Sequence, residues 1–293
     1  MSINLKKDSS VSGETAADFL QRKIPAAPAG YLHQLLKKGK VLRAGKPVGA
    51  DEVLKEGETL VLPDSSRLRQ LIELSAARPA APVILYENDQ LLIADKPAGL
   101  AVHSSEGHEE ANLTALLEAR AAQRKEKFKI APVHRLDLET SGAILFGKGR
   151  KALGELGELV MARQLRKTYL ALVAGTYAGP EELDSQVRAK GKTKEARMRV
   201  KLLAANAKAS LLEIDLVTGR QHQIRQQLSQ QGYPLYGDHR YHGPCPAELS
   251  RVFLHSWQLA FHSPFGGEPI QVTAPLPDEL QAFLPPLGIS FSA

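Results

Sequence analysis

The chain has 293 residues, of which 43% are hydrophobic, with a formal net charge of +6 and a pI near 9.3. These values predict one large and one small domain and favour a polyanionic partner. The sequence has no apolar run near the roughly 20 residues that cross a bilayer, no apolar signal-peptide region at its start, and one cysteine, Cys245, which excludes intramolecular disulfides. We therefore expect a cytoplasmic protein.

Residues 1–63 are predicted to form a small α+β domain that binds RNA. Apolar residues recur at helical spacing over 16–23 and 31–36. The second helix is expected to end at Lys37 and Lys38, because basic residues in the last turn and a following glycine stop a helix. Two helices followed by a basic hairpin favour RNA binding, so both lysines are expected to contact the RNA backbone. The strands are predicted at 41–43 and 58–62, and the turns at 44–46 and 55–57.

Residues 64–82 are expected to be a linker, with a helix at 67–74 before a stretch rich in alanine and proline. Residues 83–293 form the predicted large domain. Its strand-like segments follow one another without a helix between each pair, which predicts an α+β fold with a mixed, mostly antiparallel sheet flanked by helices and loops. The expected strands are 83–86, 91–94, 143–146, 168–174, 197–203, 209–217, 251–254 and 258–262, and the expected helices are 112–123, 150–163 and 221–231.

Basic residues are concentrated between positions 188 and 201, where one residue, Glu195, is acidic. Their spacing places most of them on one face if the segment is extended. A solvated surface is the ordinary explanation of a single lysine run, but a second basic group at 120–129 and a pI above 9 favour nucleic acid. We therefore expect contacts to the RNA backbone from Arg188, Lys190, Lys192 and Lys194.

Residues 134–142, His-Arg-Leu-Asp-Leu-Glu-Thr-Ser-Gly, lie between two apolar runs, where one strand ends and another begins. Asp137 and Glu139 fit the carboxylate pair of a glycosidase if this segment is extended. A hydrolase triad of Ser141, His134 and Asp137 is disfavoured, because the serine lacks a glycine-flanked nucleophile elbow. The structural alternative is a polar loop in which Asp137 or Thr140 caps a turn.

Two further segments favour a catalytic role for Asp137. Tyr169, at the start of a predicted strand, is either a core residue or a platform that stacks on a base while its hydroxyl reaches a polar partner. Thr218 and Gly219 turn the chain into a predicted helix whose first N–H groups suit an anion. Arg225, one turn into that helix, can reach a carboxylate from another loop, and such a pair would keep Asp137 ionised.

Together these segments resemble the RluA-type pseudouridine synthases over residues 83–285. The resemblance also rests on residues 95–103 (Asp-Lys-Pro-Ala-Gly-Leu-Ala-Val-His) and on residues 232–238, which continue the last motif. One departure is Leu138, where a basic residue is common, and we expect it to affect RNA contact more than chemistry. The N-terminal stretch is similar to the small domain named after ribosomal small-subunit protein four.

The resemblance implies a role for each matching residue. Asp137 is expected to be the catalytic aspartate, Tyr169 to stack on the target base, and Arg225 to be the basic partner of the aspartate. Arg135 is expected to fill the space left by the flipped uridine, and Ile224 to pack against the base. The remaining residues that we expect to bind the substrate or shape its site are His134, Thr140, Gln221, His222 and Lys96.

The implied reaction breaks the N-glycosidic bond of a uridine, rotates the uracil and rejoins it through carbon 5, after the base has left its stack. No cofactor is expected, and no metal, because the histidines at 239, 255 and 262 are too scattered to be ligands. The expected partner of this monomer is RNA, with ribosomal RNA favoured by the N-terminal module and transfer RNA as the alternative. The competing functions are a glycosidase that uses Asp137 with Glu139, and a non-catalytic RNA-binding or ribosome-assembly protein on the same scaffold.

Overall fold

Contacts between Cα atoms in the computed structural model divide the chain into two units, residues 1–81 with 103–115 and residues 82–102 with 116–293. The predicted helix at 67–74 and linker at 64–82 lie largely outside the described residues, and Lys190 lies outside them entirely. The predicted domain boundaries stay predictions. The structure describes residues 2–7, 13–24, 27, 29–65, 68–69, 71–72, 82–103, 112–189 and 191–291.

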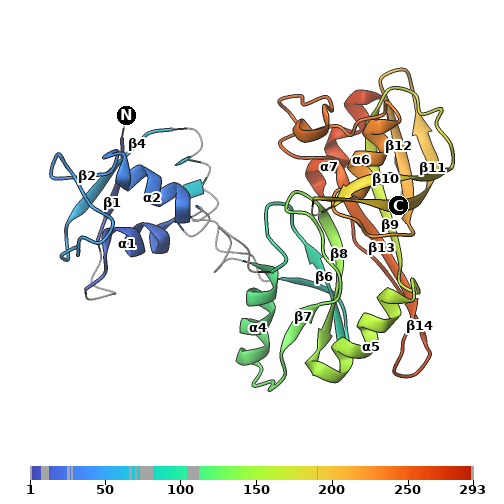
Figure 1. The fold of residues 1–293 in the computed structure, drawn as a ribbon, viewed down its shortest axis with the longest axis horizontal. Coiled ribbons are helices and arrows are strands. Elements are labelled where there is room, and N and C mark those ends of the chain that lie inside the picture. Colours follow the sequence, from blue (N-terminus) through green and yellow to red (C-terminus); the bar gives the residue numbers. More distant parts are fainter. Residues whose placement is uncertain are drawn as a thin grey trace. The chain divides into compact units, whose positions relative to one another are not determined.

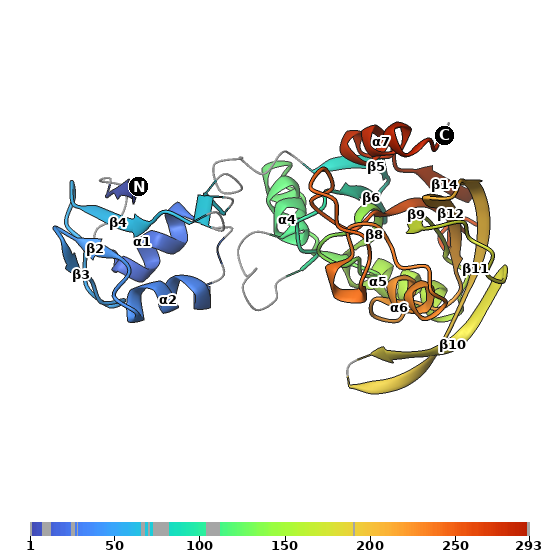
Figure 2. The ribbon, with the colours of Figure 1, turned by 90° about the horizontal axis from the view of Figure 1, so that it is seen from above.

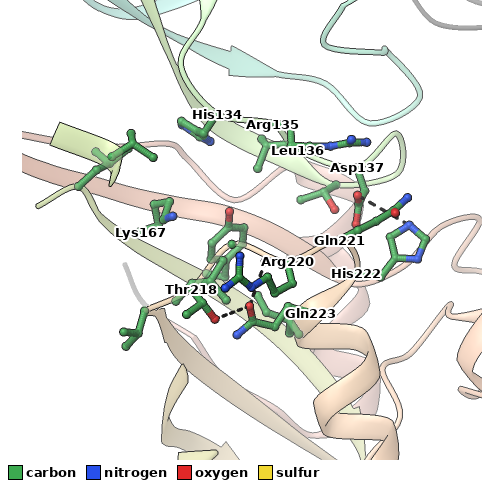
Figure 3. A pocket seen from close by; sticks show the side chains of 18 of the residues that line it. His134, Arg135, Leu136, Asp137, Lys167, Thr218, Arg220, Gln221, His222 and Gln223 are labelled. Carbon is green, nitrogen blue, oxygen red and sulfur yellow. Dashed lines mark hydrogen bonds and ion pairs between the residues drawn. The ribbon is translucent and has the colours of Figure 1, made fainter. Parts of the chain in front are cut away.

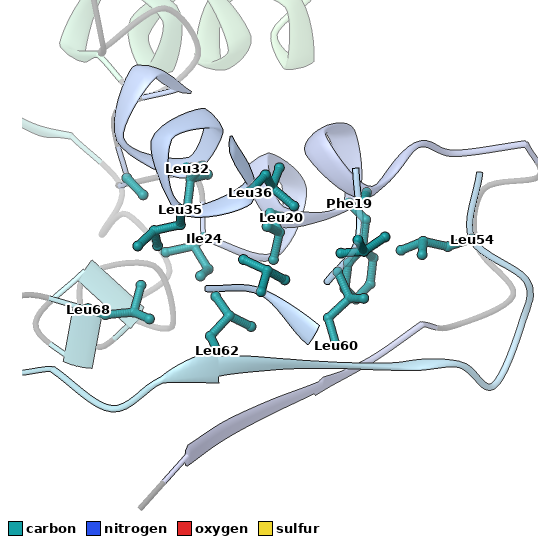
Figure 4. Close-up of a cluster of buried hydrophobic side chains, with 14 residues drawn as sticks. Phe19, Leu20, Ile24, Leu32, Leu35, Leu36, Leu54, Leu60, Leu62 and Leu68 are labelled. Atoms are coloured by element: carbon teal, nitrogen blue, oxygen red, sulfur yellow. The ribbon is translucent and has the colours of Figure 1, made fainter. Parts of the chain in front are cut away.

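In the described part of the first unit, helices α1 and α2 pack over a four-stranded sheet of order β1-β4-β2-β3, and residues 68–69 and 71–72 are also helical. Its first helix begins after Thr15, whose hydroxyl oxygen accepts a hydrogen bond from the Asp18 main-chain N–H at 3.2 Å. Phe19 and Leu20 on that helix are fully buried together with Leu60 of the sheet (Figure 4). Both predicted helices are confirmed. The elements are α1 (Ala16–Lys23), α2 (Ala29–Lys37), β1 (Ser2–Lys6), β2 (Leu42–Arg43), β3 (Lys46–Pro47) and β4 (Thr59–Pro63).

The second unit is built on a ten-stranded sheet (Figure 1). Its pairings are antiparallel except for the parallel pair β13–β8, so the predicted mixed, mostly antiparallel sheet is confirmed. The strand order is β10-β11-β12-β9-β13-β8-β6-β5, with β14 beside β13 and β7 beside β8. The strands are β5 (Val83–Glu87), β6 (Leu91–Lys96), β7 (Ile130–Pro132), β8 (Ser141–Lys148), β9 (Arg166–Ala174), β10 (Glu182–Ala189), β11 (Lys192–Ala205), β12 (Ala209–Leu216), β13 (Leu254–His262) and β14 (Pro269–Thr273).

Helices cover this sheet close to where they were predicted. The expected strand at 251–254 is wrong, because β13 begins only at Leu254 and residues 251–253 are an irregular approach to it. No described helix is both long enough and apolar enough to cross a membrane. The helices are α4 (Leu113–Gln123), α5 (Gly149–Met161), α6 (Gln223–Gln230) and α7 (Asp278–Phe283), and 3-10 turns cover 239–241 and 285–287.

The basic segment 188–201 forms a hairpin, and most of its described cations share one face, as expected: Arg188, Arg197, Arg199 and Lys201. β10 and β11 pair with Arg188 opposite Thr193, and Figure 2 shows this β10–β11 hairpin reaching beyond the rest of the sheet. Lys192 and Lys194 lie on the other face, the one on which the later residues Ala196, Met198 and Val200 of β11 are buried. Arg197 and Arg199 lie on the opposite face, where they pair with carboxylates of β10 at 2.6 and 2.9 Å.

Candidate active site

A cavity of about 450 Å³ opens in the second unit between the segment 133–140, strand β9 and the start of helix α6 (Figure 3). Its size is that of a small-molecule or nucleotide site. Five cations line it, and one acid does, Asp137. The cavity therefore suits an anionic ligand. The cations are Arg135, Arg163, Lys167, Arg220 and Arg225.

Asp137 begins a tight turn, residues 137–140, which we call the catalytic turn. The Thr140 N–H donates to the Asp137 carbonyl at 3.1 Å, so the segment is not extended and Glu139 does not share the cavity with Asp137. Gly142 follows with φ +109°, and a Cβ there would lie 2.2 Å from the Ser256 carbonyl oxygen of β13. Glycine is thus required where the turn enters the sheet.

Buried cations hold the catalytic turn from behind. Lys96, fully buried, donates to the carbonyls of Leu138 at 3.1 Å, Leu100 at 2.9 Å and Pro97 at 2.9 Å. Arg251 donates to the Glu139 carbonyl at 3.1 Å. Burial, followed by the charge of Arg251, lowers the pKa of Lys96 to about 7. The expected contact of Lys96 with substrate is therefore not available in this arrangement, because all three of its donors are used inside the fold.

Ser141 faces away from the cavity. Its hydroxyl lies 2.9 Å from His255 Nδ1 and is buried. It is not among the cavity-lining residues, and His134 hydrogen-bonds elsewhere, to the Leu145 N–H at 3.1 Å. This geometry excludes the hydrolase triad.

Arg225 is not the ion-pair partner of Asp137 that we expected. It makes a two-pronged salt bridge to Asp238, with nitrogen–oxygen distances of 2.6 and 2.7 Å. Asp238 is completely buried and draws the guanidinium because an unpaired buried carboxylate is costly. Arg225 also lies 3.7 Å from Glu139. Among the described residues, the basic side chain that lies beside Asp137 is His222, whose Nε2 is 3.8 Å from Oδ1.

His222 occupies a strained position at the start of α6. Its φ of 51° is left-handed, which is uncommon for a residue with a side chain. Nδ1 lies 3.1 Å from the Tyr241 hydroxyl. Burial lowers the pKa of His222, and the charge of Asp137 opposes that effect. The histidine is thus directed toward the acid and held there from its other nitrogen.

Tyr169 lines the cavity from β9 and is 5% exposed, so it is at once a core residue and part of the site wall. Burial is the main cause that raises the pKa of Tyr169, and the charge of Asp137 adds to it. The hydroxyl is therefore protonated at physiological pH. Ile224, also buried, lines the same cavity from α6.

A row of glutamines on α6 ties the cavity to the β10–β11 hairpin. Gln226 exchanges hydrogen bonds of 2.9 and 3.0 Å with the main chain of Arg188. Gln227 donates to the Ala196 carbonyl of β11 at 2.9 Å. Sequence reasoning missed this function of the glutamines, although their repeated spacing on one helix was a signal.

The structure brings most of the predicted site residues together. Lys167, which sequence reasoning missed, also lines the cavity, and its signal was its position two residues before Tyr169 on one strand. Arg188, Lys192 and Lys194 are exposed on the hairpin, and Lys37 and Lys38 are exposed on the first unit. The predicted residues that line the cavity are His134, Arg135, Asp137, Thr140, Tyr169, Gln221, His222, Ile224 and Arg225.

Known proteins resemble this chain over nearly all its length. The family model for RNA pseudouridylate synthases matches residues 90–230. The ribosomal large subunit pseudouridine synthase C of Vibrio parahaemolyticus is 30% identical over 305 residues, covering 94% of both chains. The protein of that name from Escherichia coli (strain K12) is 31% identical over 301 residues, covering 93% of this chain and 92% of the relative.

A solved structure has the same fold. Human RNA Pseudouridylate Synthase Domain Containing 4 superposes with a TM-score of 0.60 at 23% identity, over 72% of this chain and 95% of the human one. Fold, cavity and relatives together define an RNA-modifying isomerase. The chain belongs to the RluA-type family of pseudouridine synthases, as its motifs predicted.

Proposed function

We propose that this enzyme converts uridine in ribosomal RNA to pseudouridine with Asp137 as its catalytic carboxylate. The observation that carries the proposal is that Asp137 is the one acid among the described residues of a cavity lined by five cations. Such surroundings attract a polyanion to the acid. Glu139, which lies outside the cavity, has no catalytic role in this proposal.

Base flipping brings the uridine to Asp137. Arg135 is exposed beside the acid and fills the gap in the RNA stack, which offsets part of the few kcal/mol that unstacking costs. The uracil stacks on the ring of Tyr169 and packs against Ile224. Arg225 acts indirectly, through a chain of contacts. Its salt bridge holds Asp238, and Asp238 accepts a hydrogen bond from the Tyr241 N–H. The Tyr241 hydroxyl in turn contacts His222.

Ribosomal RNA is the favoured substrate because the relatives in two bacteria are named for the large ribosomal subunit. The first unit, with Lys37 and Lys38 exposed at the end of α2, serves as an accessory RNA-binding module. The enzyme then acts as a monomer in the cytoplasm, where ribosomal RNA is found. Transfer RNA as the substrate is a distinct outcome of the experiment below.

The test is to incubate purified protein with unmodified ribosomal RNA and transfer RNA and to map pseudouridines. Asp137→Asn is expected to abolish product, a loss of at least about a thousandfold, while RNA affinity stays within about tenfold. The matched control is Glu139→Gln, which removes the neighbouring acid and should retain turnover. Turnover by Asp137→Asn would contradict the assignment, and release of free uracil would instead support a glycosidase.

A further inference from the structure

Lys167 is a buried cation whose charge the fold leaves uncompensated by hydrogen bonds. Its side chain points from β9 into the cavity wall and is 9% exposed. Within the described part of the chain, its ammonium has no hydrogen-bond or ion-pair partner. The bare turn at Gly219 faces it, since a Cβ there would lie 3.6 Å from Nζ. Burial lowers the pKa of Lys167, and the charge of Asp215 opposes this.

A second unsatisfied donor lies beside Lys167. His134 Nε2 accepts from the Leu145 N–H at 3.1 Å, so its ring proton belongs on Nδ1. That Nδ1 is buried without a hydrogen bond of normal geometry, although the Arg135 carbonyl acts on it weakly. Burial and then the charge of Lys167 lower the pKa of His134 to about 3. This part of the cavity therefore presents donors and needs an acceptor.

Strand β9 determines where a hydrogen-bond acceptor for Lys167 must lie relative to Asp137. Lys167 and Tyr169 are two residues apart on one strand, so their side chains leave the same face about 7 Å apart. Figure 3 shows Asp137 and His222 on one side of the cavity and Lys167 on another, near His134 and Thr218. On the proposed function, a uridine that stacks on Tyr169 with its sugar at Asp137 directs the far edge of its base toward Lys167.

We propose that Lys167 is a further catalytic residue, whose ammonium donates a hydrogen bond to the uracil carbonyl oxygen O4. O4 lies across the ring from N1, the atom bonded to the sugar. A phosphate fits less well, because the cations that phosphates reach are exposed, as Arg135 and Arg163 are at the cavity mouth. A desolvated ammonium suits an oxygen on which charge develops during the reaction.

That charge reaches O4 by every route open to Asp137. When the N1–C1′ bond breaks, its electron pair stays on the uracil and is shared with O4. If the carboxylate adds to C6 instead, the pair of the C5–C6 double bond moves toward O4 as an enolate. The C5–C1′ bond then forms, any bond from Asp137 to the base or the sugar breaks and returns its electron pair to the carboxylate, C5 loses its proton and N1 gains one, so no net charge or atom is lost. Lys167 stays protonated throughout and supplies only electrostatic stabilisation.

The experiment uses the full-length enzyme and an RNA fragment that wild-type protein modifies, with uridine or 4-thiouridine at the target. Sulfur is a weaker acceptor than oxygen, so the ratio of the two single-turnover rates reports on a contact to this atom. Lys167→Met is expected to lower the rate with uridine about a hundredfold, to leave RNA affinity within about threefold, and to change the rate ratio. The control is Lys151→Met, an exposed lysine of α5 outside the cavity, which should match wild type.

Wild-type rates in Lys167→Met, or a rate ratio equal to that of wild type, would overturn the proposal. A phosphate contact would also overturn it. In that case Lys167→Met weakens RNA binding, and a neutral methylphosphonate beside the target, which weakens binding to wild type, has no effect on binding to the variant. If Lys167→Met does not fold, the same rate ratio is measured with Lys167→Arg, which retains the positive charge but displaces it. Failure of wild-type protein to form pseudouridine contradicts the proposed function itself and is detected before any variant is made.

Discussion

Behind the catalytic turn, one histidine fixes the direction of a chain of hydrogen bonds. His255 Nε2 lies 3.2 Å from the Ala274 carbonyl and must donate to it, which leaves Nδ1 as an acceptor. The Ser141 hydroxyl therefore donates to Nδ1 and accepts from Arg251 Nη2 at 3.0 Å. Burial lowers the pKa of His255 to about 4, so the chain keeps this direction at physiological pH. Polar residues of the motif thus shape the turn from its buried side.

At the scale of single residues, we predict that Tyr169→Phe distinguishes the contribution of the tyrosine ring from that of its hydroxyl. Stacking survives, so RNA affinity is unchanged, while the single-turnover rate falls about tenfold because a polar group beside Asp137 is lost. The melting temperature should shift by only a few degrees, since the ring still fills its place in β9. Circular dichroism and the rate measurement decide the point, and a large fall in melting temperature with normal activity would make Tyr169 a core residue only.

At the scale of elements, α6 and the β10–β11 hairpin act together. The buried glutamines of α6 hold the hairpin by its main chain, so the cations near its tip keep a defined position beside the cavity. The two faces of the hairpin differ in charge, because acids of β10 neutralise the arginines on one of them. RNA phosphates should therefore contact the cations that lack such acids.

We predict that replacing Arg188, Lys192 and Lys194 with alanine weakens RNA binding and flattens its salt dependence. The slope of log affinity against log salt is negative, and loss of three phosphate contacts reduces its magnitude by about 2. The matched control replaces Arg199 and Glu182 with glutamine, which removes a salt-bridged pair of opposite charges from the same hairpin and leaves its net charge unchanged. Fluorescence anisotropy at several salt concentrations gives both slopes, and an unchanged slope in the triple variant would make this hairpin ordinary surface.

At the scale of the whole molecule, buried ionisable groups set the response to acid. His134 and His255 have pKa values lowered by burial to about 3 and about 4, below their ordinary 6.5. The unfolded chain therefore binds more protons below pH 6.5. Glu87, held by hydrogen bonds from Arg120 and Lys148, has a pKa lowered to about 2 from 4.5. Asp95 acts in the opposite direction, because burial raises its pKa to about 6.

We predict two stages of acid destabilisation. Stability is complete above pH 6.5 and falls toward pH 4 as the unfolded histidines become protonated, with Asp95 offsetting part of the loss. Below pH 4.5 a second fall begins as the contribution of Glu87 is lost. Thermal unfolding measured from pH 7 to 3 tests this, and Glu87→Gln should flatten the lower stage alone. A melting temperature that stays constant between pH 6.5 and 4.5 would contradict the histidine contribution.

The sequence by itself determined the features that depend on neighbours along the chain. Helical periodicity identified α1 and α2, and alternation identified most strands, because these patterns repeat within a few residues. The motifs around Asp137, Tyr169 and Arg225 identified the family for the same reason. They also nominated nine residues that the fold brings to one cavity.

Only the tertiary structure decided which charges meet. Asp137 and Asp238 were equally open to Arg225 in the sequence, and the buried position of Asp238 took the guanidinium. Lys96 and Lys167 are both lysines beside a motif. Lys96 is fully hydrogen-bonded inside the fold, whereas the ammonium of Lys167 at the cavity has no hydrogen-bond partner among the residues that the structure describes. Burial and pairing depend on residues distant in sequence, and no local pattern contains them.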